Sequence, residues 1–244
     1  MPANTSDRVA ESLARLKATP DKNLFSVIEE LATDEAGQAA LMQYLQERAQ
    51  NLSRAFDPTR PATVDLVAGK VYQVLFQADS PVCADYLQIH FPMGIVPLRS
   101  EKALDYHPLQ LLLAKQDFQA ADQFTLQKLC ELAGESAVQR KWIYFTEVDQ
   151  FPAIDLQTIN ALWLVHSEGK FGFSIQREIW LSLGKSWDKL WSKIGWKEGI
   201  NWTRYPQGFT WDLTAPKGHL PLSNQLRGVR VIASLLAHPA WTQE

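Results

Sequence analysis

The chain has 244 residues, a net charge of −3, 46% hydrophobic residues and 21% charged residues, which is the composition of an ordinary soluble globular protein. Its longest apolar runs fall far short of the roughly 20 residues that a membrane-spanning helix requires. The first residues contain no hydrophobic segment, so neither a secretion signal nor a transit peptide is expected. The sequence therefore predicts a cytoplasmic protein and leaves peripheral membrane association through partners open.

Charged residues and tryptophans are distributed unevenly along the chain. Residues 1–133 carry 12 basic and 17 acidic side chains, whereas residues 134–244 carry 12 basic and 10 acidic side chains. All nine tryptophans lie between Trp142 and Trp241. An aromatic, mildly positive half suits a flat, anionic ligand, but its charge is too low for a duplex nucleic-acid interface.

The N-terminal part reads as a succession of amphipathic helices between residues 7 and 90. Asp21 is the expected N-cap of one helix and Asp34 opens the next. Residues 51–63 contain Pro58 and Pro61 and should form a loop. We expect an N-terminal helical bundle or repeat-like domain over residues 1–90, with a supporting or protein-binding role.

Residues 91–104 contain two prolines and a glycine and are the predicted linker to a second domain, residues 105–244. We expect this domain to be helical as well, because no alternating strand pattern occurs. Its predicted helices are 109–115, 118–132, 138–150, 155–167, 175–183, 187–194 and 222–238, and Asp155 is the expected cap of the fourth. The fold class is therefore all-α.

The stretch after Trp196 should be irregular for about 25 residues, which in a compact domain usually indicates a functional loop. It holds several glycines and prolines together with four aromatic side chains: Trp202, Tyr205, Phe209 and Trp211. On the helix that follows, Asn224, Arg227 and Arg230 form one strip opposite the apolar face. Arginines beside exposed rings can hold the carboxylates of a flat ligand.

Motifs for catalysis are absent. The chain has no Gly-rich phosphate loop, cysteine cluster, HExxH pair or nucleophile elbow, and its five histidines are scattered. We expect no catalytic residues, no intrinsic cofactor and no directly bound metal. Two alternatives stay open: an enzyme acting on the flat ligand, with His219 or Asp212 as proton donor, and a single-stranded nucleic-acid-binding protein.

A set of colinear motifs covers about residues 105–241. The motifs are 155–163, 169–176, 179–180, 193–196, 209–213, 215–221 and 224–230. Together they resemble the "genomes uncoupled" family of tetrapyrrole-binding proteins, in the form found in cyanobacteria. The resemblance implies an all-helical cupped-hand domain that binds protoporphyrin IX and magnesium-protoporphyrin IX. It also implies a non-catalytic regulator that stimulates magnesium chelatase, an enzyme of chlorophyll biosynthesis, through the large porphyrin-binding subunit. We expect the chain to be a monomer. The enzyme alternative then becomes an enzyme acting on a tetrapyrrole.

The resemblance also assigns site residues by motif. Arg227 and Arg230 match the basic pair that faces the propionates, and Asn224 matches the position near the porphyrin-bound magnesium, as a possible indirect ligand. Trp202, Tyr205 and Phe209 match the loop that closes over the ring, although relatives often have Trp where this chain has Tyr205. Phe145 and Val148 are expected to line the palm, and residues 134–140 to form the opposite rim. The spacing of four other aromatics places them in the core: Trp163, Phe171, Phe173 and Trp180.

Overall fold

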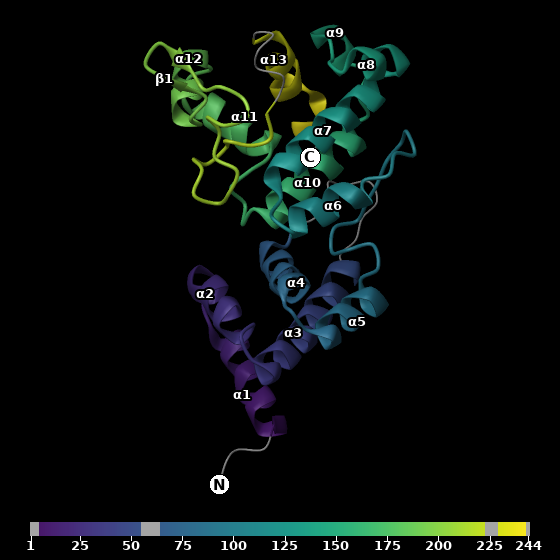
Figure 1. The fold of residues 1–244 in the computed structure, drawn as a ribbon, viewed down its shortest axis with the longest axis vertical. Helices are drawn as coiled ribbons and strands as arrows, with labels where there is room; N and C mark the ends of the chain where they lie inside the picture. The colour runs from purple at the N-terminus through teal and green to yellow at the C-terminus, as the bar shows by residue number, and fades with distance from the viewer. Residues whose placement is uncertain (1–4, 55–63, 223–228, 243–244) are drawn as a thin grey trace.

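The structure, a computed structural model, describes residues 5–54, 64–222 and 229–242. Helices dominate both halves of the chain, so the all-α prediction is confirmed. Figure 1 shows α1–α5 at one end of an elongated molecule and α6–α13 at the other. No helix in these ranges is both long and apolar enough to cross a membrane.

The N-terminal domain contains five helices around one apolar core. They are α1 (Thr5–Ala18), α2 (Asp21–Leu31), α3 (Glu35–Arg54), α4 (Leu66–Gln77) and α5 (Pro81–His90). Asp34 accepts hydrogen bonds from the backbone N–H groups of Ala36 and Gly37 and so begins α3 as predicted. The prediction for Asp21 was wrong by one position, because Pro20 is the N-cap and Asp21 is the first helical residue.

The second domain is built around α10 and contains eight α-helices, one 3-10 helix and a short hairpin in the described part of the chain. They are α6 (His107–Ala114), α7 (Phe118–Ala133), α8 (Glu135–Arg140), α9 (Phe145–Val148), α10 (Ala153–His166), α11 (Phe173–Ser182), α12 (Trp187–Lys193), β1 (Lys197–Glu198), β2 (Asn201–Trp202), α13 (Arg230–Ala237) and the 3-10 helix η2 (Pro239–Trp241). Trp163 on α10 is fully buried and donates its indole N–H to the Thr125 hydroxyl of α7 at 3.0 Å. Phe118 and Phe171 pack against the same ring.

Three details of this domain differ from the sequence-based expectation. The predicted helix over 138–150 is broken into α8 and α9, because Lys141 adopts a left-handed backbone with φ of 59°. Asp155 does not cap α10, which begins at Ala153; it is buried and accepts hydrogen bonds from Tyr106, Ser100 and the Glu101 N–H. A short antiparallel hairpin, β1–β2, lies where no strand was expected.

Residues 91–104, the predicted linker, lie against the second domain. The Val96 N–H donates to the Gln110 side chain at 3.0 Å, and the Thr158 hydroxyl donates to the Arg99 carbonyl at 2.8 Å. The bonds from Ser100 and Glu101 to Asp155 hold the end of this segment. The segment is therefore fixed to α6 and α10 along much of its length.

The two domains meet where α4 packs on α10 and α6 (Figure 1). The Lys70 ammonium is buried there and bonds to Glu29 of α2 at 2.5 Å and to Glu168 just after α10 at 2.6 Å. Burial alone would lower the pKa of Lys70, but the hydrogen bonds to Glu168 and Glu29 raise it. Gly69 permits this close packing, because an added Cβ would lie 2.3 Å from the Val165 side chain. The charged lysine thus joins one carboxylate from each domain.

Lys70→Ala is expected to lower the free energy of unfolding by on the order of 2 kcal/mol, because it leaves Glu168 without its buried partner. The loss should stay below that of a fully buried pair, since the Glu29 side chain is 60% exposed. Denaturant unfolding measures the change. Lys17→Ala, which removes an exposed pair with Glu47, is the control and should cost less than about 1 kcal/mol. Equal losses in the two variants would show that the lysine at the domain junction carries no special weight.

Candidate functional site

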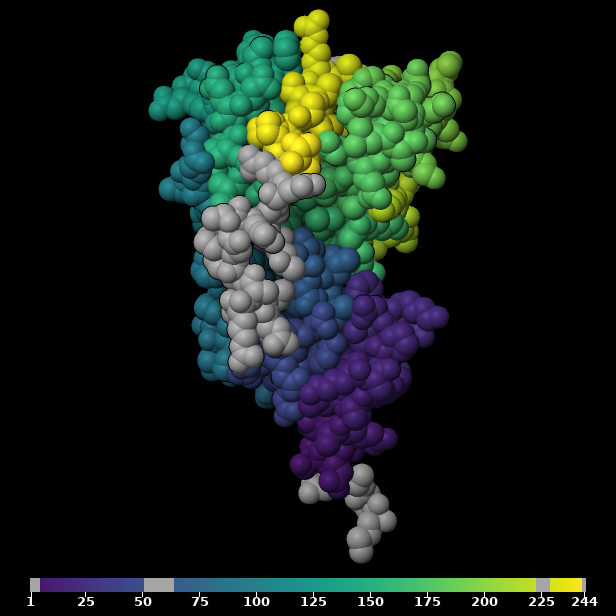
Figure 2. Space-filling model, turned by 180° about the vertical axis from the view of Figure 1, so that it is seen from behind, coloured from purple at the N-terminus to yellow at the C-terminus, as the bar shows by residue number. Residues whose placement is uncertain are grey.

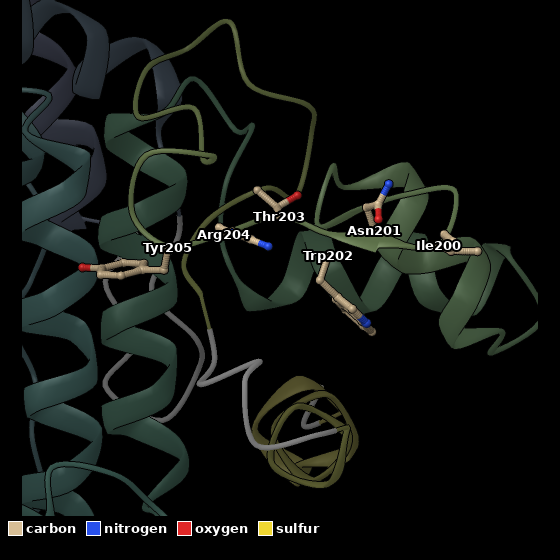
Figure 3. A pocket seen from close by; sticks show the side chains of 6 residues that line it. All are labelled: Ile200, Asn201, Trp202, Thr203, Arg204 and Tyr205. Carbon is tan, nitrogen blue, oxygen red and sulfur yellow. The ribbon is translucent and has the colours of Figure 1, made fainter.

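A pocket of about 610 Å³ lies along the hairpin β1–β2 and the residues that follow it. Its lining is Ile200, Asn201, Trp202, Thr203, Arg204 and Tyr205 (Figure 3). The pocket is open, and three large apolar side chains are exposed in it: Ile200 by 90%, Trp202 by 48% and Tyr205 by 39%. Exposed rings along one concave segment are typical of a binding site rather than of a core.

The segment is held from both sides. The Thr203 N–H donates to the Trp196 carbonyl and the Thr203 hydroxyl to the Gly195 carbonyl, each at 3.0 Å. On the other side, the Gln123 amide of α7 donates to the Tyr205 hydroxyl at 2.9 Å. Figure 3 shows the consequence: the Tyr205 ring points toward the helices, whereas Trp202 points the other way, toward the yellow C-terminal helix seen end-on.

Behind the hairpin, four tryptophans form a stack. The ring centroids of Trp180 and Trp187 are 4.8 Å apart, those of Trp187 and Trp191 are 5.3 Å apart, and those of Trp191 and Trp196 are 5.4 Å apart. Trp202 leans on Trp191 at 5.9 Å. Through Trp191, this stack connects the exposed Trp202 ring to buried Trp196.

The irregular segment after the hairpin is fastened to the core by buried polar side chains. His219 bonds through Nδ1 to the Ile194 carbonyl at 2.6 Å, and its Nε2 accepts from the Thr210 N–H at 3.2 Å. Since Nε2 accepts, Nδ1 carries the proton and the ring is neutral. Gln176 of α11 donates to the carbonyls of Gly218 and Pro221 at 3.0 and 2.9 Å.

These contacts argue against the enzyme alternative. His219 is 2% exposed, has both nitrogens satisfied, and burial lowers its pKa. Asp212 accepts hydrogen bonds from the Thr214 N–H and hydroxyl, as in an ordinary turn. Buried His219 is not presented to a substrate, and the hydrogen bonds from Thr214 lower the pKa of exposed Asp212, so that this carboxylate holds no proton at neutral pH. In the described parts of the chain no three His, Cys, Asp or Glu side chains converge on a metal position.

Asp122 of α7 holds the irregular segment at Leu222. It is buried and accepts a 2.6 Å hydrogen bond from the Leu222 N–H, immediately before residues 223–228. Burial raises the pKa of the Asp122 carboxyl to about 7, and the Leu222 bond opposes that rise. A carboxyl in this state titrates close to neutral pH.

A second exposed surface, separate from the pocket lining, is formed by α13 and α9, which pack together. The Arg230 guanidinium lies 5.3 Å from the centre of the Phe145 ring, and both side chains are exposed, Phe145 by 37%. Next to them, Arg140 binds Glu147 and lies 4.5 Å from the Tyr144 ring centre. In Figure 2 the yellow C-terminal segment is seated between the teal α7–α9 and the green α11–β1 region.

The predicted site residues fall into three groups. Four are exposed: Trp202 and Tyr205 line the pocket, and Phe145 and Arg230 lie on the surface of α9 and α13. Two others are interior: Val148 is fully buried, and Phe209 is 5% exposed, packed on Trp211 and His219. Asn224 and Arg227 lie outside the described residues.

Of the four aromatics expected in the core, Trp163, Phe171 and Phe173 are fully buried, and Trp180 is half-buried at the end of the stack. Several residues of the site were not singled out from the sequence, among them Arg204, Ile200, Gln123 and Asp122. The first two could have been found as neighbours of the aromatic residues in the irregular stretch. The α7 pair had no sequence signal, because its partners are distant along the chain.

Comparisons with known proteins agree with this architecture. The GUN4-like family model matches residues 99–239, and the model of the ARM-like repeat domain at the N-terminus of that family matches residues 3–92. The chain therefore belongs to the GUN4-like family. A Ycf53-like protein of Synechocystis is 52% identical over 98% of both chains.

Other relatives cover the second domain. The chloroplastic tetrapyrrole-binding protein of Arabidopsis thaliana is 38% identical, over 58% of this chain and 57% of its own. The solved structure of GUN4 from Chlamydomonas reinhardtii has a TM-score of 0.57 at 39% identity, covering 61% of this chain and 95% of its own. The ligand-free structure of Arabidopsis thaliana GUN4 has a TM-score of 0.53 at 38% identity, covering 59% of this chain and 99% of its own.

Asp122→Asn is expected to remove a pH dependence of stability. The folded pKa of about 7 lies above the ordinary value near 3.9, so the folded protein holds the proton while the unfolded chain has lost it. The carboxyl therefore costs stability as pH rises between about 4 and 7, by up to roughly 1.4 kcal/mol per pH unit. Asn keeps an oxygen for the Leu222 N–H but does not titrate.

Unfolding free energies of wild type and Asp122→Asn across this pH range provide the measurement. The variant should gain stability relative to wild type as pH rises, whereas the exposed control Asp79→Asn should not. A constant difference between Asp122→Asn and wild type would contradict the raised pKa.

Proposed function

We propose that the chain binds a tetrapyrrole, protoporphyrin IX or magnesium-protoporphyrin IX, between the segment Ile200–Tyr205 and the wall formed by α13 and α9. The observation that carries the proposal is the pairing of exposed rings with an exposed guanidinium: Trp202 and Tyr205 on one wall, Arg230 above Phe145 on the other. A related chloroplast protein is named for tetrapyrrole binding. No other activity is favoured by a comparable arrangement.

The physical logic is complementarity between ligand and site. Each 100 Å² of apolar ligand surface removed from water contributes roughly 2.5 kcal/mol. Part of this gain is offset by ordering of side chains and of the bound ring. Propionate groups at the ring edge fit arginine, whose planar guanidinium can bind a carboxylate through two hydrogen bonds. Arg230 is the described residue proposed for one propionate, with Arg227 beside it in the sequence strip.

We propose that the porphyrin-bound protein regulates an enzyme. The protein acts as a non-catalytic accessory of magnesium chelatase in chlorophyll biosynthesis, stimulating it by binding porphyrin and contacting the large porphyrin-binding subunit as a monomer. Two findings support a role without catalysis: the buried, satisfied state of His219 and the turn role of Asp212. Stimulation is tested by assaying chelatase with and without the purified chain.

Titration with protoporphyrin IX should quench the tryptophan fluorescence and saturate at about one ring per chain, because Trp202 and the stack behind it lie at the proposed site. The porphyrin absorbs where tryptophan emits, so a bound ring accepts excitation from nearby indoles. A linear, non-saturating decrease, equal to that of free tryptophan, would mean that no ring is bound and would remove the basis of the proposal.

Arg230→Ala should weaken protoporphyrin binding by roughly tenfold or more, since a charge-assisted hydrogen bond is worth about 1.5–3 kcal/mol and about 1.4 kcal/mol is a factor of ten. The fold should persist, because Arg230 is exposed at the start of α13. Arg8→Ala, another exposed arginine in the N-terminal domain, is the matched control and should bind normally. Unchanged affinity in a folded Arg230→Ala protein would reduce this arginine to solvated surface.

Asn224→Ala should lower the affinity for magnesium-protoporphyrin more than the affinity for the metal-free ring. An amide oxygen near the ring centre suits Mg²⁺, directly or through water, and this contact exists only when the metal is present. Parallel titrations of both ligands against wild type and variant measure the difference. Equal losses of affinity for the two ligands would show that Asn224 contacts the macrocycle or supports the protein structure, and its role toward the metal would be abandoned.

A further inference from the structure

Arg204 stands apart from the other basic side chains of the site segment. Three basic residues occur between Trp196 and Pro221: Lys197, Arg204 and Lys217. Lys197 pairs with Asp188 at 2.9 Å and Lys217 lies 3.6 Å from Glu178. Within the described ranges, Arg204 has no ion pair, and its side chain is exposed in the pocket.

The backbone around Arg204 is fixed although its side chain is free. Next to it, Thr203 is bonded to Trp196 and Gly195. The Arg204 carbonyl accepts from the Gly208 N–H at 2.8 Å, and a Cβ added to Gly208 would lie 2.8 Å from that carbonyl oxygen. The turn is therefore tight, and it fixes the position of the Arg204 Cα. Because this backbone is already ordered, the entropy cost of ordering it when a ligand binds the guanidinium is small.

The surroundings of this guanidinium suit an anion on a flat ligand. Its neighbours in the lining are the exposed rings of Trp202 and Tyr205, and no acidic side chain lines the pocket. Figure 3 shows the Arg204 side chain leaving the segment between these two rings, which point in different directions. Arginine in such a setting binds a carboxylate through its planar fork, while the rings contact an apolar face.

We propose that Arg204 is a ligand-binding residue that takes a carboxylate at the edge of the bound ring, on the wall opposite Arg230. The proposal rests on tetrapyrrole binding and deepens it: the two walls each supply a guanidinium, and the two carboxylates of protoporphyrin provide a partner for each. Arg204 thereby makes the site selective for the acid form of the ring over a ring whose carboxylates are masked.

The test compares protoporphyrin IX with its dimethyl ester, which keeps the flat apolar ring and removes both negative charges. Both are titrated into the full-length wild type and into Arg204→Ala, in the same buffer and solvent. Arg204→Ala should bind the free acid roughly tenfold more weakly and the ester nearly as wild type does. Lys193→Ala, which removes an exposed charge from α12, is the control and should change neither. Circular dichroism and melting temperature verify that each variant is folded.

Each outcome has a distinct meaning. If wild type binds the acid and Arg204→Ala binds it equally well, or loses both ligands by the same factor, Arg204 does not hold a carboxylate and the inference fails, while tetrapyrrole binding stands. If wild type binds neither ring, the proposed function itself fails and the role of Arg204 fails with it. A loss confined to the free acid, which high salt reproduces in wild type by screening, supports the assignment.

Discussion

The site depends on one constraint: a long irregular segment must satisfy its backbone polar groups inside a helical domain. Three buried side chains meet this demand: one belongs to the segment itself and two belong to helices of the core. His219 makes hydrogen bonds to the Thr210 N–H and to the Ile194 carbonyl at the end of α12. Gln176, on α11, donates hydrogen bonds to two carbonyls of the segment, and Asp122, on α7, accepts one from the Leu222 N–H. Because these contacts are inside, the segment between them can expose its aromatic rings without losing its shape. The buried polar groups therefore hold the backbone that carries the exposed residues proposed to contact the ligand.

This arrangement separates rigid from accessible parts of the molecule. The tryptophan stack ends at Trp196, which is buried and donates its indole N–H to the His219 carbonyl at 2.8 Å, and Trp202 leans on the same stack from outside. At the opposite end of the domain, α4 is joined to α10 through buried Lys70. The N-terminal domain thus lies at the other end of the molecule from the hairpin and from α13 (Figure 1).

The sequence predicted what local patterns determine. Helical periodicity located most helices, Asp34 marked the start of α3, and the run of rings and prolines after Trp196 marked the irregular segment. It could not predict contacts made over long sequence separations. Asp155 has the spacing of a cap, but its carboxylate is consumed by Ser100, Glu101 and Tyr106. Val148 shares a short helix with exposed Phe145, yet the packing of α13 on α9 buries it. Arg204 differs from Lys197 only through the absence of an acidic neighbour, which a sequence does not display.

Hydrogen–deuterium exchange with and without protoporphyrin IX tests the location of the site most directly, because amides are slowed where a ligand covers or orders the backbone. The account predicts slower exchange in two separate places: residues 200–208, together with the start of α13 and its neighbour α9. The helices α1–α3, at the other end of the molecule, should exchange as before. Protection centred on the N-terminal domain, or a bound ring that leaves both walls unchanged, would contradict the account.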